Sequence, residues 1–242
     1  MTFLKTTAAT IAFLALIVSP ALATKDVSSP TVTKGKLKVE ARFGSEDDNL
    51  VSRDDRFRQV YIFEYGVTDW WATRLNFKLT QLPSTGLEYQ ATEWENKFQL
   101  FFEKTDGFNG AFKVVYSSVD ITGSPDIFSL KTMAEKKFGA IKVRGNLGLD
   151  WEVGTFSGKT ATLNAAAQVL APVTENLSAG IEWFADFGEI NAIPGFDLQD
   201  QQLGPVFVYK FNDTYAIETG YLFGISDRAS DGTFKLFLKA TL

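Results

Sequence analysis

The stretch KLKVEARF at residues 36–43 alternates apolar side chains with charged ones. One face of this stretch carries Leu37, Val39, Ala41 and Phe43, and the other carries Lys36, Lys38, Glu40 and Arg42. Successive side chains of a β-strand point to opposite sides, so a period of two predicts a strand with one apolar and one charged face. A strand of this kind lies between two different solvents.

The same alternation continues along the chain. It is clear at residues 71–80, 94–103, 139–152 and 233–242, and it has one or two faults at 57–65, 110–117, 127–136, 160–170, 177–187, 202–210 and 214–223. These segments make about twelve strands, an even number, with lengths near the ~9–11 residues that cross a tilted bilayer. An open sheet edge would leave unpaired backbone groups in lipid. The pattern therefore predicts an all-β chain that forms a closed antiparallel transmembrane β-barrel.

The connections between these strands alternate in length. Short ones are expected at 66–69, 137–139, 172–176 and 212–214, a slightly longer one at 103–110, and long polar ones at 44–55, 81–86, 120–126, 153–159, 188–200 and 224–232. Short turns at one end and long loops at the other are typical of periplasmic turns and extracellular loops. Five aromatic residues near the strand ends are expected at the membrane–water boundary: Tyr65, Trp70, Trp71, Tyr89 and Trp151.

The first residues have the pattern of a secretory signal peptide. Lys5 supplies a positive charge, residues 8–18 form an apolar run, and Ala21-Leu22-Ala23 is a small-residue cleavage site. We therefore expect a signal peptide over residues 1–23, a short periplasmic segment over 24–34, and the barrel over 35–242. This organisation predicts export through the inner membrane and a location in the outer membrane of a Gram-negative cell.

The composition argues against several classes of function. The chain has no histidine and no cysteine, and its 24 Lys and Arg against 29 Asp and Glu give a net charge of −5. The negative charge argues against nucleic acid as a partner. The missing histidine removes the usual general base of a hydrolase. We predict no catalytic residues, no metal site and no cofactor.

Two acidic features leave narrower alternatives open. Glu93 and Glu95 share a strand face and could act as a carboxylate pair on a sugar, although alternate inward residues of any polar barrel lie close together. The first long loop contains EDDN at 46–49 and two aspartates at 54–55, which could collect hard cations. Its order lacks the spacing and the glycine of a calcium loop, so a solvated acidic loop is the simpler interpretation.

The charged strand faces are expected to point inward. A Lys or Arg on the lipid face at the bilayer midplane costs about 2–4 kcal/mol. Both signs are mixed on the inward face, so the charges either pair across the lumen and fill it or leave a field for a solute. Six basic residues are our candidates for lining a pore: Arg42, Arg58, Arg74, Lys78, Lys142 and Arg144.

These observations favour a small passive channel or transporter for small solutes. The main alternative is a non-conducting structural or surface-binding barrel that acts through its extracellular loops. A soluble periplasmic β-sandwich that binds a lipid or sugar and an outer-membrane enzyme are weaker alternatives. Expected partners are outer-membrane lipid, lipopolysaccharide, the barrel-assembly machinery and a small solute.

Several short motifs resemble those of known outer-membrane barrels. QQLGPV at 201–206, TGYLFG at 219–224 and the last strand at 234–242 resemble the final strands of the meta-pathway phenol-degradation barrel family, and YGVTD at 65–69 resembles a periplasmic turn of such proteins. The resemblance implies a porin-like or transporter-like barrel of about this length. It implies no particular solute. The chain ends in Leu242 where barrels of this class usually end in Phe.

Overall fold

A computed structural model describes residues 25–50, 54–82, 86–158 and 160–242 of the chain. The predicted signal peptide over residues 1–23, with its cleavage site, lies outside the described residues.

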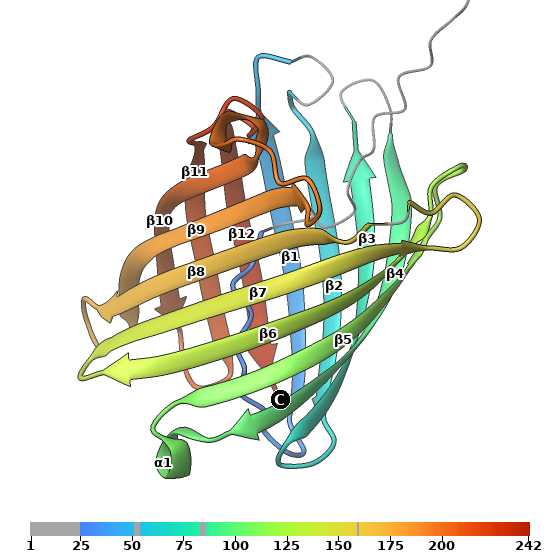
Figure 1. Ribbon diagram of the computed structural model, residues 1–242. Helices are drawn as coiled ribbons and strands as arrows, with labels where there is room; N and C mark the ends of the chain where they lie inside the picture. The colour runs from blue at the N-terminus through green and yellow to red at the C-terminus, as the bar shows by residue number, and fades with distance from the viewer. Residues whose placement is uncertain (1–24, 51–53, 83–85, 159) are drawn as a thin grey trace, which may run out of the picture.

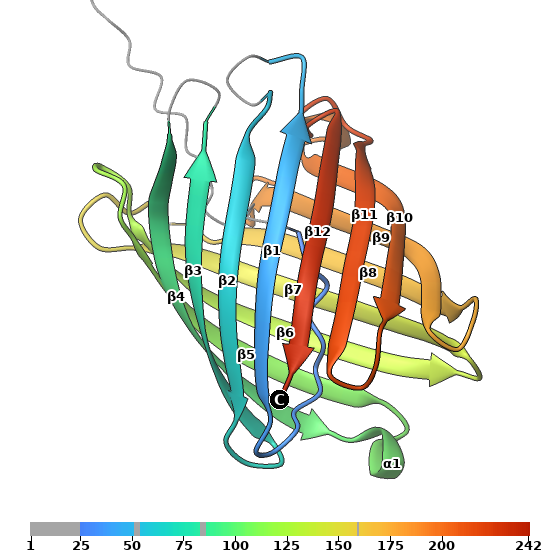
Figure 2. The ribbon, with the colours of Figure 1, turned by 180° about the vertical axis from the view of Figure 1, so that it is seen from behind.

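Twelve antiparallel strands form one closed barrel, in which each strand pairs with its sequence neighbours and β1 pairs with β12 (Figures 1 and 2). The strands are β1 (Leu37–Asp47), β2 (Phe57–Gly66), β3 (Trp71–Gln81), β4 (Leu87–Phe101), β5 (Asn109–Val119), β6 (Asp126–Phe138), β7 (Ile141–Val153), β8 (Thr162–Pro172), β9 (Leu177–Glu189), β10 (Asp200–Lys210), β11 (Tyr215–Gly224) and β12 (Gly232–Thr241). The predicted fold class is confirmed. Closure leaves no strand edge unpaired, as a lipid environment requires.

The two faces of the strands differ as the alternation predicts. Large apolar side chains project outward and stay exposed, among them Phe63 (45%), Trp94 (55%), Leu147 (51%) and Ile181 (57%). The inward positions of the same strands carry charged and amide side chains that are buried within the barrel. An exposed apolar belt around a polar interior is the inverse of a soluble protein and matches the two solvents of a membrane barrel.

The two ends of the barrel also differ. At the turn end, where the C-terminus lies, β2–β3, β6–β7, β8–β9 and β10–β11 have short connections; at the loop end, longer segments join β1–β2, β7–β8, β9–β10 and β11–β12 (Figure 1). Among the residues that the structure describes, two short helices occur in connections: α1 (Glu103–Asp106) at the turn end and η2 (Phe196–Leu198) at the loop end. Tyr65, Trp70 and Trp71 lie at the turn end, and Tyr89 and Trp151 lie toward the loop end.

No helix among the residues described is long and apolar enough to cross a membrane.

Strand β4 begins at Leu87, seven residues before the start that the sequence indicates. The register between β3 and β4 shifts after Lys78, so that Gln90 is an extra residue in β4. A bulge of this kind reverses the alternation, because the residues on either side of it exchange faces. Strand β4 also ends at Phe101, and Glu103, which the alternation assigns to the strand, starts helix α1.

Residues 25–33 lie inside the barrel. This segment was expected to be periplasmic, but the structure places it along the lumen between the loop end and the turn end, where it turns into β1 (Figure 2). Val27 is 1% exposed and packs against Phe184 of β9 and Leu222 of β11. The segment has no periodicity of its own, so its position depends on partners that are distant in the sequence.

Candidate functional site: the lumen and its polar cavity

An ion-pair cluster occupies the lumen near the turn end. Glu64 of β2 is bonded by three cations: Lys38 at 3.0 Å, Arg74 at 2.8 Å and Lys97 at 3.2 Å. Lys38 and Arg74 stand directly opposite Glu64 on the two neighbouring strands. Opposite charges facing each other across strands stabilise the sheet, and burial strengthens their attraction.

A second cluster lies on β9, β11 and β12, and β12 pairs with β1, the strand of Lys38. Lys235 of β12 is fully buried and bonds both Glu182 and Glu218, the latter at 3.0 Å. Lys239 also bonds Glu218, at 2.8 Å. The ring of Phe237, an inward aromatic residue, lies beneath the two ammonium groups. Both clusters show that the mixed charges of the inward face form ion pairs.

A third group of charges lies at the loop end. Glu46 of β1 bonds Arg58 at 3.0 Å and lies 3.7 Å from Arg56. In the acidic loop that follows, Asp48 accepts a hydrogen bond from the backbone of Leu50, and Asp54 accepts one from the backbone of Asp48. Within the described part of the chain, no group of acidic side chains is arranged to hold a metal ion.

Residues 25–33 are held by side chains from several strands. Lys25 bonds Asp200 at 2.9 Å, and Asp26 bonds Arg42 at 3.2 Å. Asn146 both donates to the carbonyl of Ser28 and accepts from its amide. Further contacts to the segment's backbone come from Lys97 at Ser29, Gln99 at Val32, Arg144 at Val27 and Lys235 at Lys25. The segment is therefore bound mainly through polar contacts with its backbone, and it narrows the lumen.

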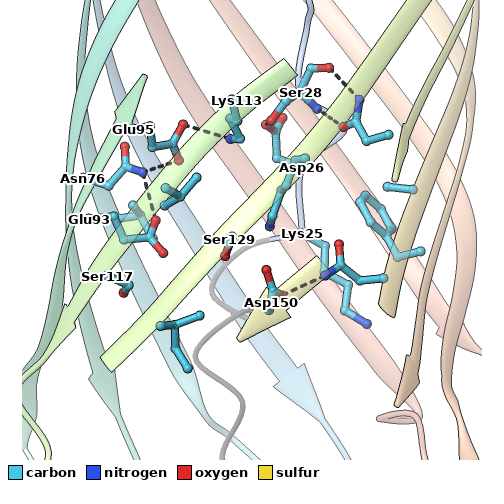
Figure 3. Close-up of a pocket in the computed structure, with 18 of the residues that line it drawn as sticks. Lys25, Asp26, Ser28, Asn76, Glu93, Glu95, Lys113, Ser117, Ser129 and Asp150 are labelled. Atoms are coloured by element: carbon cyan, nitrogen blue, oxygen red, sulfur yellow. Dashed lines mark hydrogen bonds and ion pairs between the residues drawn. The ribbon is translucent and has the colours of Figure 1, made fainter. Parts of the chain in front are cut away.

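A cavity of about 170 Å³ remains beside this segment (Figure 3). Its walls come from strands β1 to β9, and Lys25, Asp26 and Ser28 of the segment form one side. Glu95 bonds Lys113 at 2.8 Å, and Asn76 donates to both Glu93 and Glu95, at 3.0 and 2.8 Å (Figure 3). Many of the charged groups that wall the cavity are thus bonded to one another, and neutral polar groups complete the lining.

Four of the six predicted pore-lining residues lie in or beside this region. Arg42, Arg74 and Lys78 line the cavity, and Arg144 bonds Glu135 of β6 and the backbone of Val27. Arg58 belongs to the group at the loop end. Lys142 lies at the turn end of β7, opposite Lys137 and Leu170, and does not line the cavity. A role for any of the six in conduction stays a prediction.

The selection of basic residues missed the neutral part of the site. Asn76, Ser117, Ser129 and Asn164 line the cavity together with Asp150. A signal for them is present in the sequence, because several inward positions of β5 to β8, such as Ser117, Ser129 and Asn164, carry small or uncharged side chains. Small inward side chains leave space in a barrel of this size, whereas paired long side chains fill it.

The carboxylate pair that could have served an enzyme is engaged in ion pairs. Glu93 bonds Lys78, and Glu95 bonds Lys113 and lies 3.8 Å from Arg74. Both also accept a hydrogen bond from Asn76. Two carboxylates held by cations on the same wall do not form the facing acid and base of a glycosidase.

Comparisons with known proteins agree on the architecture. No model of a known protein family matches the chain, and no curated protein matches it in sequence. In structure, the chain is similar to a COG4313 outer membrane channel from Pseudomonas putida F1, with a TM-score of 0.65 and 12% identity over 90% of this chain and 100% of that one. It is also similar to the NanC porin (TM-score 0.61, 8% identity, 84% and 100% coverage) and the KdgM porin (0.56, 11%, 84% and 98%). At these identities the likeness shows a shared fold.

Proposed function

We propose that the chain is a small passive channel or transporter for small solutes in a bacterial outer membrane. The observation that carries this proposal is a closed barrel with an apolar outside and a polar lumen that retains a cavity of about 170 Å³. The similar barrels are described as channels and porins. In this arrangement the loop end faces the outside of the cell and the turn end faces the periplasm.

Passage through this barrel requires residues 25–33 to shift. The segment contacts opposite walls, with Asp26 on β1 and Ser28 on β7, so it divides the lumen. It has no strand pairing of its own and is held by side-chain contacts that can exchange for water one at a time. The structure corresponds to a closed or narrowed state, and displacement of the segment widens the path.

The cellular setting belongs to the same proposal. The predicted signal peptide at 1–23 supports export, and the exposed apolar belt supports a lipid environment in contact with lipopolysaccharide and assembly by the barrel-assembly machinery. The C-terminal motifs support kinship with the meta-pathway phenol-degradation barrels. None of these features selects a particular solute.

Single-channel recording tests the proposal. The refolded mature protein, placed in a planar bilayer, is expected to give discrete current steps. Arg144→Met removes a guanidinium that holds the carbonyl of Val27 at 2.8 Å, so the steps are expected to become larger or more frequent. Lys137→Met is the matched control, because Lys137 is an exposed cation on the neighbouring strand at the turn end. A folded protein that never conducts, with or without Arg144, contradicts the channel.

The filled lumen favours one second candidate. Because the inward charges are paired and residues 25–33 occupy the space between them, the same structure suits a non-conducting barrel that acts through its loops. The distinguishing result has two parts. Neither the unaltered protein nor Arg144→Met gives current steps, and binding of a surface ligand is lost when the loops at the loop end are replaced.

A further inference from the structure

A glycine on one wall of the barrel contributes to the space of the cavity. Lys113 of β5 stands opposite Lys131 of β6, which stands opposite Gly148 of β7, which stands opposite Asn164 of β8. A Cβ added to Gly148 would lie 2.5 Å from Oδ1 of Asn164 and 3.1 Å from Cγ of Lys131. The glycine therefore leaves room for both side chains to face the cavity.

Several polar atoms around the cavity are buried without a partner. Oδ1 of Asn76, Oγ of Ser117 and Oδ1 of Asp150 accept or donate no hydrogen bond, although these residues are only 3%, 2% and 9% exposed. All three residues line the cavity, and Figure 3 shows them around it. A buried polar atom without a partner costs about 1–3 kcal/mol, so these atoms mark a place where a polar molecule binds.

A cation completes the set. Lys131 also lines the cavity, and its ammonium forms no ion pair or hydrogen bond with the residues that the structure describes. Its strongest electrostatic neighbour is Asp150, which stands diagonally across β6 and β7. The other basic residues nearby are engaged, since Lys113 bonds Glu95 and Arg42 bonds Asp26. Lys131 is thus a donor in the lining of the same cavity as two unpartnered acceptors, Oδ1 of Asp150 and Oδ1 of Asn76.

These groups fit a molecule that carries both charges. The carboxylate of a small zwitterion can accept from Lys131, while its ammonium donates to Asp150 and Asn76. A simple anion would leave the two acceptors unsatisfied, and a simple cation would leave Lys131 unsatisfied. The apolar side chains of Val115 and Ile127, also in the lining, suit an aliphatic side chain. In size, the cavity is comparable to the engineered cavity of about 150 Å³ that binds benzene.

We infer that this cavity is a binding site for a small zwitterionic solute of the α-amino acid type, contacted by Lys131, Asp150, Asn76 and Ser117. The inference deepens the proposed channel function by naming a solute class. Binding itself does not depend on conduction, so the two can fail separately.

The test is calorimetric titration of the refolded mature protein in detergent with four probes. L-alanine carries both charges, acetate only the negative one, ethylammonium only the positive one, and glycerol neither. L-alanine is expected to bind at least about tenfold more tightly than the other three, because only it satisfies both sets of groups. Equal binding of all four probes, or no binding of L-alanine, overturns the inference.

Variants then locate the site. Lys131→Met is expected to weaken L-alanine binding by about tenfold or more, since it removes one charge-assisted contact. Ser117→Ala leaves the charges unchanged and is expected to weaken it by a smaller factor. Lys137→Met, on the same face of β6 but exposed at the turn end, is the control and should bind as the unaltered protein does. A normal affinity in folded Lys131→Met overturns the site.

The electrical recording separates this site from the channel. If the unaltered protein binds L-alanine but gives no current steps in a planar bilayer, the result supports the site and contradicts the channel. Current steps in a protein that does not bind L-alanine support the channel and overturn the zwitterion site.

Discussion

Replacing Lys235 with methionine tests how strongly the paired charges of the lumen stabilise the barrel. Lys235 is fully buried and bonds Glu182 and Glu218. In the variant, Glu218 keeps its bond with Lys239 at 2.8 Å, whereas Glu182 keeps only the amide of Gln168 at 2.7 Å. One buried carboxylate is then left without a cation, and removing one partner of a buried pair costs about 3–5 kcal/mol.

The assay is urea unfolding of the refolded protein in lipid vesicles. A loss of about 4 kcal/mol lowers the folding equilibrium constant about a thousandfold. With an m-value of about 2 kcal/mol/M, the midpoint falls by about 2 M. The double variant with Glu182→Gln is expected to recover part of the loss, because the neutral amide no longer needs a cation.

An exposed pair supplies the control. Lys34 lies 4.0 Å from Asp69, with side chains 63% and 80% exposed, so Lys34→Met is expected to cost less than about 1 kcal/mol. The reasoning is refuted if Lys235→Met shows an equally small loss. That result would mean that water already screens the charges of the lumen.

Three further predictions concern other parts of the molecule. Gly148→Ala places a Cβ against Asn164, so it should shrink the cavity and weaken L-alanine binding in calorimetry while current steps persist. Leu147→Lys puts a cation on the outer face and should destabilise the barrel in vesicles by about 2–4 kcal/mol, whereas Phe156→Lys in a loop should leave the unfolding midpoint unchanged. The backbone amide of Phe102 and the hydroxyl of Thr105 donate hydrogen bonds to the carboxylate of Asp106 in α1 and lower its pKa. The ionised carboxylate therefore stabilises α1 at neutral pH, and this contribution is lost as the pH falls through the lowered pKa. A carboxyl titration of Asp106 by NMR that shows no shift in its pKa would contradict this prediction.

The strands could be predicted because each one separates two solvents. The alternation at 36–43 places Glu40 and Arg42 in the lumen and leaves the apolar face outside, as in β1. The same rule located all twelve strands, since a period of two needs no knowledge of distant contacts. It failed at the start of β4, where the extra residue Gln90 reverses the faces. A bulge depends on the partner strand, which the local pattern does not contain.

The site was predicted only in part, for a similar reason. The inward orientation of the charged side chains could be predicted, because placing Arg74 or Lys78 in lipid is costly. The strand register decides which of these charges form ion pairs, and the local pattern does not contain the register. Residues 25–33 occupy the lumen through partners that are distant in the sequence. Ser28 and its partner Asn146, for example, are more than a hundred positions apart. The cavity was missed because part of its lining, such as Ser117 and Asn76, carries no charge, and because Lys131 was not among the basic residues selected.

The central claim is that residues 25–33 close a conducting barrel, and a reversible cross-link tests it most directly. The side chain of Asn146 on β7 is hydrogen-bonded to the backbone of Ser28, and the chain has no cysteine of its own, so Ser28→Cys with Asn146→Cys is designed to join the segment to β7 by a disulfide. We predict that the oxidised protein gives no current steps in a planar bilayer and that a reductant restores them. Current of the same size and frequency in the oxidised and reduced states, with the cross-link verified by mass spectrometry, would contradict the claim.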